Sequence, residues 1–352
     1  MKQLFSERFR SARILSGLSL QDLADKIDNK ISRQALHKYE KGEVVPDSEM
    51  INLLSNALNV RPDFFFREAK IEFTDIEFRK LKKLPAKEEN KIIEDVKDKL
   101  SRYLELEEIL SIQTRFENPL KDIEPINSFD QVEAAAKKVR ADWKLGSDPI
   151  FNSIELLEDK HIKVVVVDGG EDFDGMQTWV NNAIPVIAIN KGNIKSDDRV
   201  RFTVLHELAH LLLPLKHLQE KQKEKYCHQF AAAMLLPAEA ATEELGNGRS
   251  KLLIQELGLL KKQYGISIQA IVMRAKDLNI ITDSYCKQFF FFMQQMGWKI
   301  HEPTEYKGVE ESNRFDQLLL RALAEEIISV SKAASLRNQS LAEFREKILI
   351  VK

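Results

Sequence analysis

Two histidines that flank a glutamate are the residues of this chain with the clearest chemical potential. The stretch reads His206-Glu207-Leu208-Ala209-His210. Residues four positions apart lie on one face of a helix, so both imidazoles can reach a single metal ion. Zinc sites in hydrolases use nitrogen ligands, an open position for water and a carboxylate base, which Glu207 can supply. The spacing therefore predicts a zinc-dependent hydrolase with His206 and His210 as metal ligands.

The residues around this motif favour a metal site over a surface helix that happens to carry two histidines. Leu205, Leu208 and Leu212 recur at helical spacing, which predicts that the helix is largely buried. Buried imidazole and carboxylate groups without partners would strongly destabilise the fold. A bound metal ion removes that penalty, so we expect one here.

The start of a second apolar helix, which ends before Pro237, offers candidates for a third metal ligand. Glu224 and His228 are four residues apart and share a face, so one could bind the metal while the other holds a ligand by a hydrogen bond. We expect Glu224 to be the third ligand, with His228 and then Cys227 as alternatives. Tyr226 or His228 could instead stabilise an oxyanion.

The N-terminal segment shows a different pattern, that of two short helices joined by a turn. Ser19 and Ser32 each precede an amphipathic segment, as N-cap residues do. This order is typical of a helix-turn-helix, whose second helix enters the major groove of DNA. The side chains that we expect to contact DNA are Gln21, Ser32, Arg33, Gln34, His37 and Lys38.

These DNA contacts divide into two kinds by the chemistry of the side chains. Arg33 and Gln34, with His37, lie near the start of the second helix, where arginine can read guanine and glutamine can read adenine. Gln21 and Lys38 are placed to hold phosphates. Basic and acidic residues nearly balance in this segment, which leaves open a helix-turn-helix that contacts only proteins.

Composition limits the class of protein further. The chain has 352 residues, a net charge of −2 and two cysteines, which excludes a polybasic protein and a disulfide framework. No apolar run approaches the roughly 18 residues that span a bilayer, and the N-terminus has no apolar signal core. We therefore expect a cytoplasmic protein without membrane contact.

Three segments rich in β-branched residues precede the histidine motif. They predict strands over residues 162–168, 173–180 and 183–190, which we expect to form a small antiparallel sheet. Helices are expected near residues 130–144 and 152–159. The segment 186–190 could be an edge strand that holds an extended peptide by backbone pairing, or an ordinary core strand.

Two parts of the sequence resemble known families. Residues 18–24 and 32–42 resemble the lambda-repressor-like helix-turn-helix of the XRE family, with about one extra residue in the turn and Asn29 where glycine is usual. Residues 199–210 and 224–237 resemble the ImmA/IrrE family of metallo-endopeptidases, in which an N-terminal XRE module is a familiar arrangement. Many members carry Glu-x-Glu-Ala-Asn where this chain has Glu224, Lys225, Tyr226, Cys227 and His228.

The resemblance implies a mainly α fold with a small antiparallel β-sheet, an α+β class. It implies Zn²⁺ held by His206, His210 and a glutamate, with Glu207 as the base. The expected regions are a helix-turn-helix DNA-binding domain at residues 1–70, a helical linker at 71–118, a zincin-like metallopeptidase domain at 119–285 and a helical C-terminal region at 286–352.

The expected function is that of a transcriptional regulator with a zinc-dependent endopeptidase domain. Its partners would be a double-stranded DNA operator, bound as a homodimer, and a regulatory protein that it cuts, such as a helix-turn-helix repressor in phage, mobile-element or stress control. A latent resting state, with Cys227 as the blocking group, is a further hypothesis. The alternative is a regulator or antitoxin-like protein, with a co-encoded toxin as its partner, whose zinc is structural or sensory.

Overall fold

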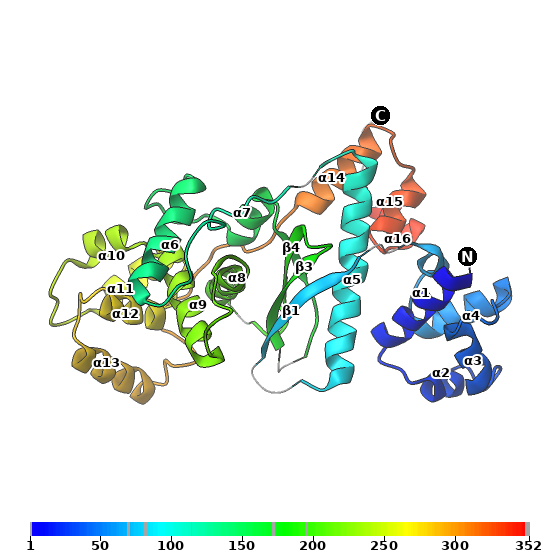
Figure 1. Ribbon diagram of the computed structural model, residues 1–352, viewed down its shortest axis with the longest axis horizontal. Helices are drawn as coiled ribbons and strands as arrows, with labels where there is room; N and C mark the ends of the chain where they lie inside the picture. Colours follow the sequence, from blue (N-terminus) through cyan, green and yellow to red (C-terminus); the bar gives the residue numbers. More distant parts are fainter. Residues whose placement is uncertain are drawn as a thin grey trace.

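The computed structural model describes residues 2–68, 71–80, 84–113, 115–170, 173–194 and 196–348. A helical module at one end of the molecule is followed by the long helix α5, a small sheet and a large helical region (Figure 1). In these parts of the chain no helix is both long and apolar enough to cross a membrane.

The N-terminal module is a bundle with its own apolar core, which includes Phe5, Phe9 and Leu36. Ser19 and Ser32 accept hydrogen bonds from the backbone N–H groups of Asp22 and Ala35, which confirms both predicted helix caps. Its elements are α1 (Lys2–Leu15), α2 (Leu20–Lys26), α3 (Arg33–Glu40), α4 (Ser48–Leu58) and the 3-10 helix η1 (Pro62–Phe66).

The turn between α2 and α3 shows how the chain adapts to the missing glycine. Asp28 and Asn29 both adopt left-handed backbone conformations, with φ of 55° and 52°. Asparagine and aspartate tolerate this region better than other side chains because their short polar groups form local hydrogen bonds. The helix-turn-helix therefore closes without a glycine at this position.

The sheet has four strands in the order β1-β3-β4-β2. The antiparallel β1–β3 and β3–β4 pairs are accompanied by a parallel β2–β4 pair, so the sheet is mixed and the expectation of a purely antiparallel sheet is wrong. The hairpin between β3 and β4 turns through Asn181 and Asn182, both with positive φ. The strands are β1 (Phe73–Lys80), β2 (Lys163–Val166), β3 (Phe173–Val180) and β4 (Ile184–Ile189).

The structure also bears on two other expectations for this part of the chain. Strand β4, which covers most of residues 186–190, pairs with both β3 and β2, so of the two alternatives it is the core strand. The segment 71–118 is not only a helical linker, since it supplies β1 before α5 (Ala86–Ile109). Among the described residues, β1 and β2 are the outer strands of the sheet.

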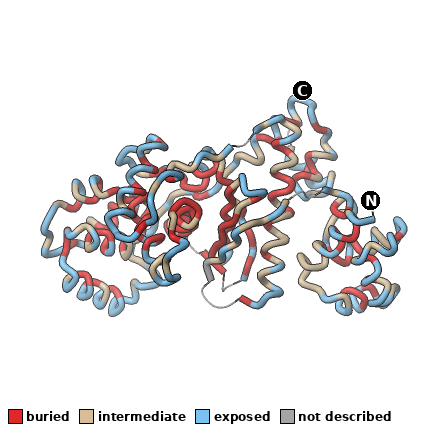
Figure 2. The backbone as a smooth tube through the Cα atoms, viewed as in Figure 1, coloured by how far each residue is buried: buried red, intermediate tan, exposed pale blue. Residues whose placement is uncertain are grey.

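Helices cover both faces of the sheet, and each face has its own apolar core. On one face α5 packs through residues such as Ile92 and Val96 against Met176 and Val186. On the other face α8 (Asp197–Leu212) contacts β3 and β4, and Figure 2 shows this helix end-on and largely buried. The surrounding helices are α6 (Phe129–Asp142), α7 (Ser153–Asp159), α9 (Glu220–Leu235), α10 (Ala238–Leu245), α11 (Ile254–Tyr264), α12 (Ile268–Asp277) and α13 (Asp283–Gln295).

The C-terminal helices α14 (Arg314–Ala324), α15 (Val330–Leu336) and α16 (Leu341–Lys347) return to α5 and share a core with Leu106. They lie near the N-terminal module in Figure 1. A buried charge cluster joins the module to α5: Asp98 Oδ1 accepts from Arg8 Nη2 at 2.9 Å, and Asp98 Oδ2 lies 3.2 Å from Arg102 Nη2. The module is therefore attached by ionic contacts as well as by the chain.

Candidate metal centre

Helix α8 carries the histidine motif in a buried position, as the leucine spacing predicts. Its first turn contains Asp197 and Asp198, whose negative charge favours a helix N-terminus. His206 is fully buried and Glu207 is 1% exposed, while the side chain of His210 is 7% exposed. Polar groups at this depth require partners, and α9 and β1 supply carboxylates that contact the two histidines.

Three side chains bring their donor atoms together at this point of α8. His206 Nε2 lies 3.2 Å from His210 Nε2, and Glu224 of α9 places its carboxylate oxygens 3.3 Å from the first and 3.2 Å from the second. Ligands at about 2.0–2.1 Å from a tetrahedral zinc ion are separated by roughly 3.3 Å. The donor set and its spacing thus fit one face of a zinc tetrahedron.

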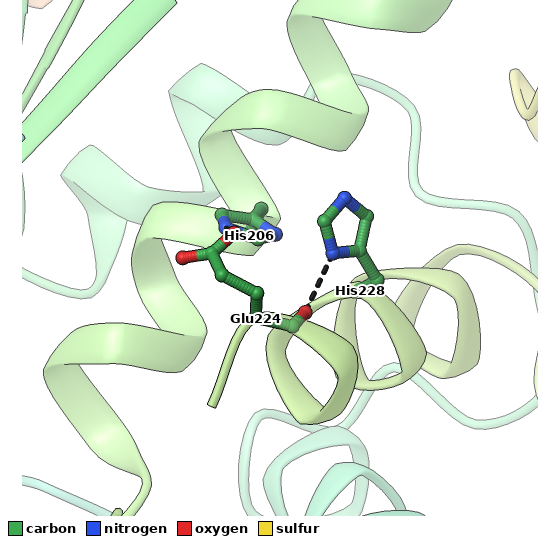
Figure 3. A group of neighbouring side chains, drawn as sticks. All are labelled: His206, Glu224 and His228. Carbon is green, nitrogen blue, oxygen red and sulfur yellow. Dashed lines mark hydrogen bonds and ion pairs between the residues drawn. The ribbon is translucent and has the colours of Figure 1, made fainter. Parts of the chain in front are cut away.

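A fourth candidate ligand, His228, lies one turn after Glu224 on α9. Figure 3 shows His206 from α8 together with Glu224 and His228 from α9. Donor atoms of these three residues lie within 4.8 Å of one another. His228 Nδ1 is 2.5 Å from the backbone carbonyl oxygen of Glu224, and its ring is 4.5 Å, centroid to centroid, from that of His206. The exposed His228 therefore borders the three-donor cluster.

The other two sequence candidates on α9 face different surroundings. Cys227 is fully buried, and burial raises the pKa of its thiol although a hydrogen bond with His210 acts in the opposite direction. Tyr226 is two residues from Glu224 and so lies on nearly the opposite face of the helix. Its ring packs edge-on against Phe129 of α6, at 5.3 Å between centroids. The structure thus brings Cys227 to the cluster but turns Tyr226 away, against its expected role at the oxyanion.

The charge state of the cluster follows from these contacts. Burial opposes a charge on His210, but hydrogen bonds with Cys227, Glu224 and Glu77 outweigh it and raise the pKa of His210 to about 12. Burial also favours the neutral acid at Glu224, yet hydrogen bonds with His206 and His210 lower the pKa of this carboxyl well below its usual range. A metal ion that binds His210 would therefore have to displace the proton that these hydrogen bonds favour.

Sequence reasoning missed Glu77, which reaches the site from β1. Its Oε2 lies 3.4 Å from His210 Nδ1. The available signal was the alternation of apolar and polar residues over residues 71–78, with Ile71 and Phe73 and later Ile76 and Phe78. An irregularity between Thr74 and Glu77 shifts the strand register there and breaks that alternation, which disguises the strand.

The predicted DNA-contacting residues lie together on the N-terminal module. Arg33, Gln34, His37 and Lys38 are all exposed on α3, whereas Leu36 and Tyr39 on its other side are buried. Gln21 is exposed on α2, where its amide donates to Asp25 Oδ1 at 2.9 Å, and Ser32 is exposed while capping α3. The polar face of α3 is therefore available to a partner.

Comparisons with known proteins agree with this arrangement. Residues 9–65 match the helix-turn-helix family model, and residues 158–276 match the model of the IrrE N-terminal-like domain. The chain is 37% identical over 70 residues to the SPbeta prophage-derived uncharacterized HTH-type transcriptional regulator YonR of Bacillus subtilis (strain 168). That match covers 20% of this chain and 63%, less than two thirds, of the relative. The chain thus joins an XRE-type helix-turn-helix domain to a metallopeptidase-like IrrE domain.

Proposed function

We propose that this protein is a DNA-binding transcriptional regulator whose second domain is a zinc-dependent endopeptidase that cuts a regulatory protein. The observation that carries this proposal is the close approach of His206, His210 and Glu224, whose donor atoms lie 3.2–3.3 Å from one another in each pair of residues. Glu207 stands beside it on the same helix, and a structural metal site has no need for such a base.

In this proposal His206 Nε2, His210 Nε2 and the carboxylate of Glu224 would hold Zn²⁺. The bound ion would supply Lewis-acid chemistry, which makes water more acidic and polarises a carbonyl group. Glu207 accepts a proton from the attacking water and then donates it to the amine that leaves when the peptide bond breaks. The burial of Glu207 limits competing contact with bulk water.

The sheet helps to position this base. A Cβ atom at Gly175 of β3 would lie 3.3 Å from Thr203 Cγ2 and 3.4 Å from Glu207 Cγ, closer than most such contacts. The glycine allows α8 to approach β3 at the position of Glu207.

An extended substrate would be held by backbone pairing with the outer strand β1, which also brings Glu77 to the site. The core strand β4 already pairs on both sides and cannot hold it.

DNA binding is proposed for the exposed face of α3. Arginine and glutamine at its start, Arg33 and Gln34, offer paired hydrogen bonds to guanine and adenine. The similarity of this segment to a helix-turn-helix regulator supports the assignment. Proteins of this architecture read two half-sites as dimers, so a homodimer on a double-stranded operator is part of the proposal.

The proteolytic function is tested with the full chain loaded with zinc and incubated with helix-turn-helix regulators encoded beside its gene. New peptide termini are detected by mass spectrometry. Glu207→Gln should retain zinc and lose cleavage by about 10²–10⁴-fold, because the amide cannot take up the proton. Undiminished cleavage by Glu207→Gln would contradict the mechanism.

A second candidate function is a regulator whose zinc site is structural or sensory. His228 favours it, since a fourth protein ligand would close the position that a substrate needs. In that case the wild type would bind zinc and DNA yet cut none of the regulators. His228→Ala would weaken zinc binding, whereas in the endopeptidase it would leave zinc bound by three ligands.

A further inference from the structure

We propose that Glu77 is a positioning residue that orients the metal ligand His210, an inference that rests on the proposed zinc site. Glu77 lies on β1, far in sequence from both α8 and α9. Its Oε2 is 3.4 Å from His210 Nδ1, while the other ring nitrogen, Nε2, is 3.2 Å from Glu224 Oε1. The carboxylate therefore contacts His210 on the side of the ring away from the metal ligands.

An irregular step in β1 aims Glu77 at this point. Thr74 pairs with Trp179 and Glu77 pairs with Gln177, so β1 advances three residues while β3 advances two. The extra residue is accommodated where Asp75 adopts a left-handed conformation with φ of 52°. A bulge of this kind changes the face on which the following side chains lie, and bulges are common beside active sites.

The strand opposite also holds the carboxylate in place. Gln177, the direct partner of Glu77 across the sheet, is 4% exposed and hydrogen-bonds to the Glu77 side chain. A glutamate side chain is ordinarily ionised near neutral pH, so it can only accept hydrogen bonds here. The anion is thus fixed between β3 and α8, although its side chain is about half exposed (48%).

The chemical consequence concerns the tautomer of His210. A carboxylate accepts a hydrogen bond but cannot donate one, so Nδ1 of His210 must carry the proton. Nε2 then presents its lone pair toward His206 and Glu224, where the metal would bind. Such a carboxylate fixes the ring and raises its basicity, and its loss typically weakens metal binding by about 10–100-fold.

The test measures zinc affinity of the full chain by competition with a chromophoric chelator. Glu77→Ala should weaken binding by about 10–100-fold, and Glu77→Gln by less, because the amide oxygen can still accept from Nδ1. Asp75→Asn is the matched control. This substitution removes the same charge from the same strand. In the described residues, the ion pair of Asp75 is with the exposed Lys216, at 3.1 Å, and not with a metal ligand. The zinc affinity of Asp75→Asn should therefore equal that of the wild type.

A spectroscopic readout separates positioning from a general loss of charge. Cobalt(II) in the site should show altered d–d bands in Glu77→Ala and wild-type bands in Asp75→Asn. If Glu77→Ala is folded, and neither it nor Glu77→Gln differs from wild type by more than about twofold in affinity, the inference is overturned. A wild type that binds no zinc overturns it together with the proposed function. If the wild type binds zinc tightly, Glu77→Ala weakens that binding and no regulator is cut, only the proposed endopeptidase activity is overturned.

Discussion

Helices α3 and α8 each carry functional residues, but they present them in opposite ways. On α3 the polar residues Arg33 and Gln34 are exposed and the apolar ones face the bundle. On α8 the polar residues His206 and Glu207 are buried, under a sheet and a second helix. A surface that meets DNA must stay open to solvent, whereas a site that binds a metal and moves protons gains from the exclusion of water.

The two sites also differ in how many elements of the chain contribute residues to them. The α3 surface is complete within one small bundle. The α8 cluster needs Glu224 from α9, Glu77 from β1 and space at Gly175 of β3. Substitutions near α3 should therefore act locally, and substitutions around α8 should act through several elements.

The largest effect is expected at Asp98 of α5, where the N-terminal module that carries α3 is attached to the rest of the chain. This carboxylate is buried among Arg8, Arg67 and Arg102, each with a side-chain exposure of 11% or less. Asp98→Ala leaves buried cations uncompensated and should lower the free energy of unfolding by about 3–5 kcal/mol.

Denaturant unfolding of the full chain measures this effect. The control is Asp95→Ala on the same helix, which breaks a partly exposed pair with Lys99 and should cost about 0–1 kcal/mol. Equal losses of stability would show that the buried cluster at Asp98 contributes no more than a partly exposed ion pair, against this account.

A smaller effect is expected on the α3 surface alone. Arg33→Ala and Gln34→Ala should each weaken binding to the operator by about 1–3 kcal/mol and relax preference at one base pair. Fluorescence anisotropy at fixed salt measures the affinity, and Arg10→Ala, an exposed arginine on α1, is the control. The zinc content of both α3 variants should equal that of the wild type. Loss of zinc in either variant would contradict the claim that substitutions on α3 act only locally.

The smallest effect, for each unit of pH, is a pH dependence confined to the α8 cluster. The raised pKa of His210 stabilises the metal-free fold below about pH 6.5, and that contribution is lost as pH rises through about 12. Zinc must displace this proton, so its affinity should increase by up to about tenfold per pH unit. Chelator competition between about pH 6 and about pH 8 tests this. For a histidine of ordinary pKa the trend would level off above about pH 6.5.

Much of this architecture could be predicted from the sequence, because local patterns determine it. The caps at Ser19 and Ser32, the buried helix around His206 and the strands β2, β3 and β4 all follow from nearby residues. Strand β1 was not predicted from the sequence, because its bulge breaks the apolar–polar alternation and its pairing partner β3 is distant in sequence. The parallel pairing of β2 with β4 and the packing of Tyr226 against α6 depend on tertiary contacts. The spacing of residues along the sequence does not determine such contacts.

The identity of the third ligand is the central claim, and elemental analysis of the purified chain tests it most directly. Wild type should retain about one zinc ion per chain after dialysis against a weak chelator, and Cys227→Ala should match it. Glu224→Ala should lose most of the metal, since it removes one corner of the donor triangle. Full zinc in Glu224→Ala together with its loss in Cys227→Ala would contradict the account.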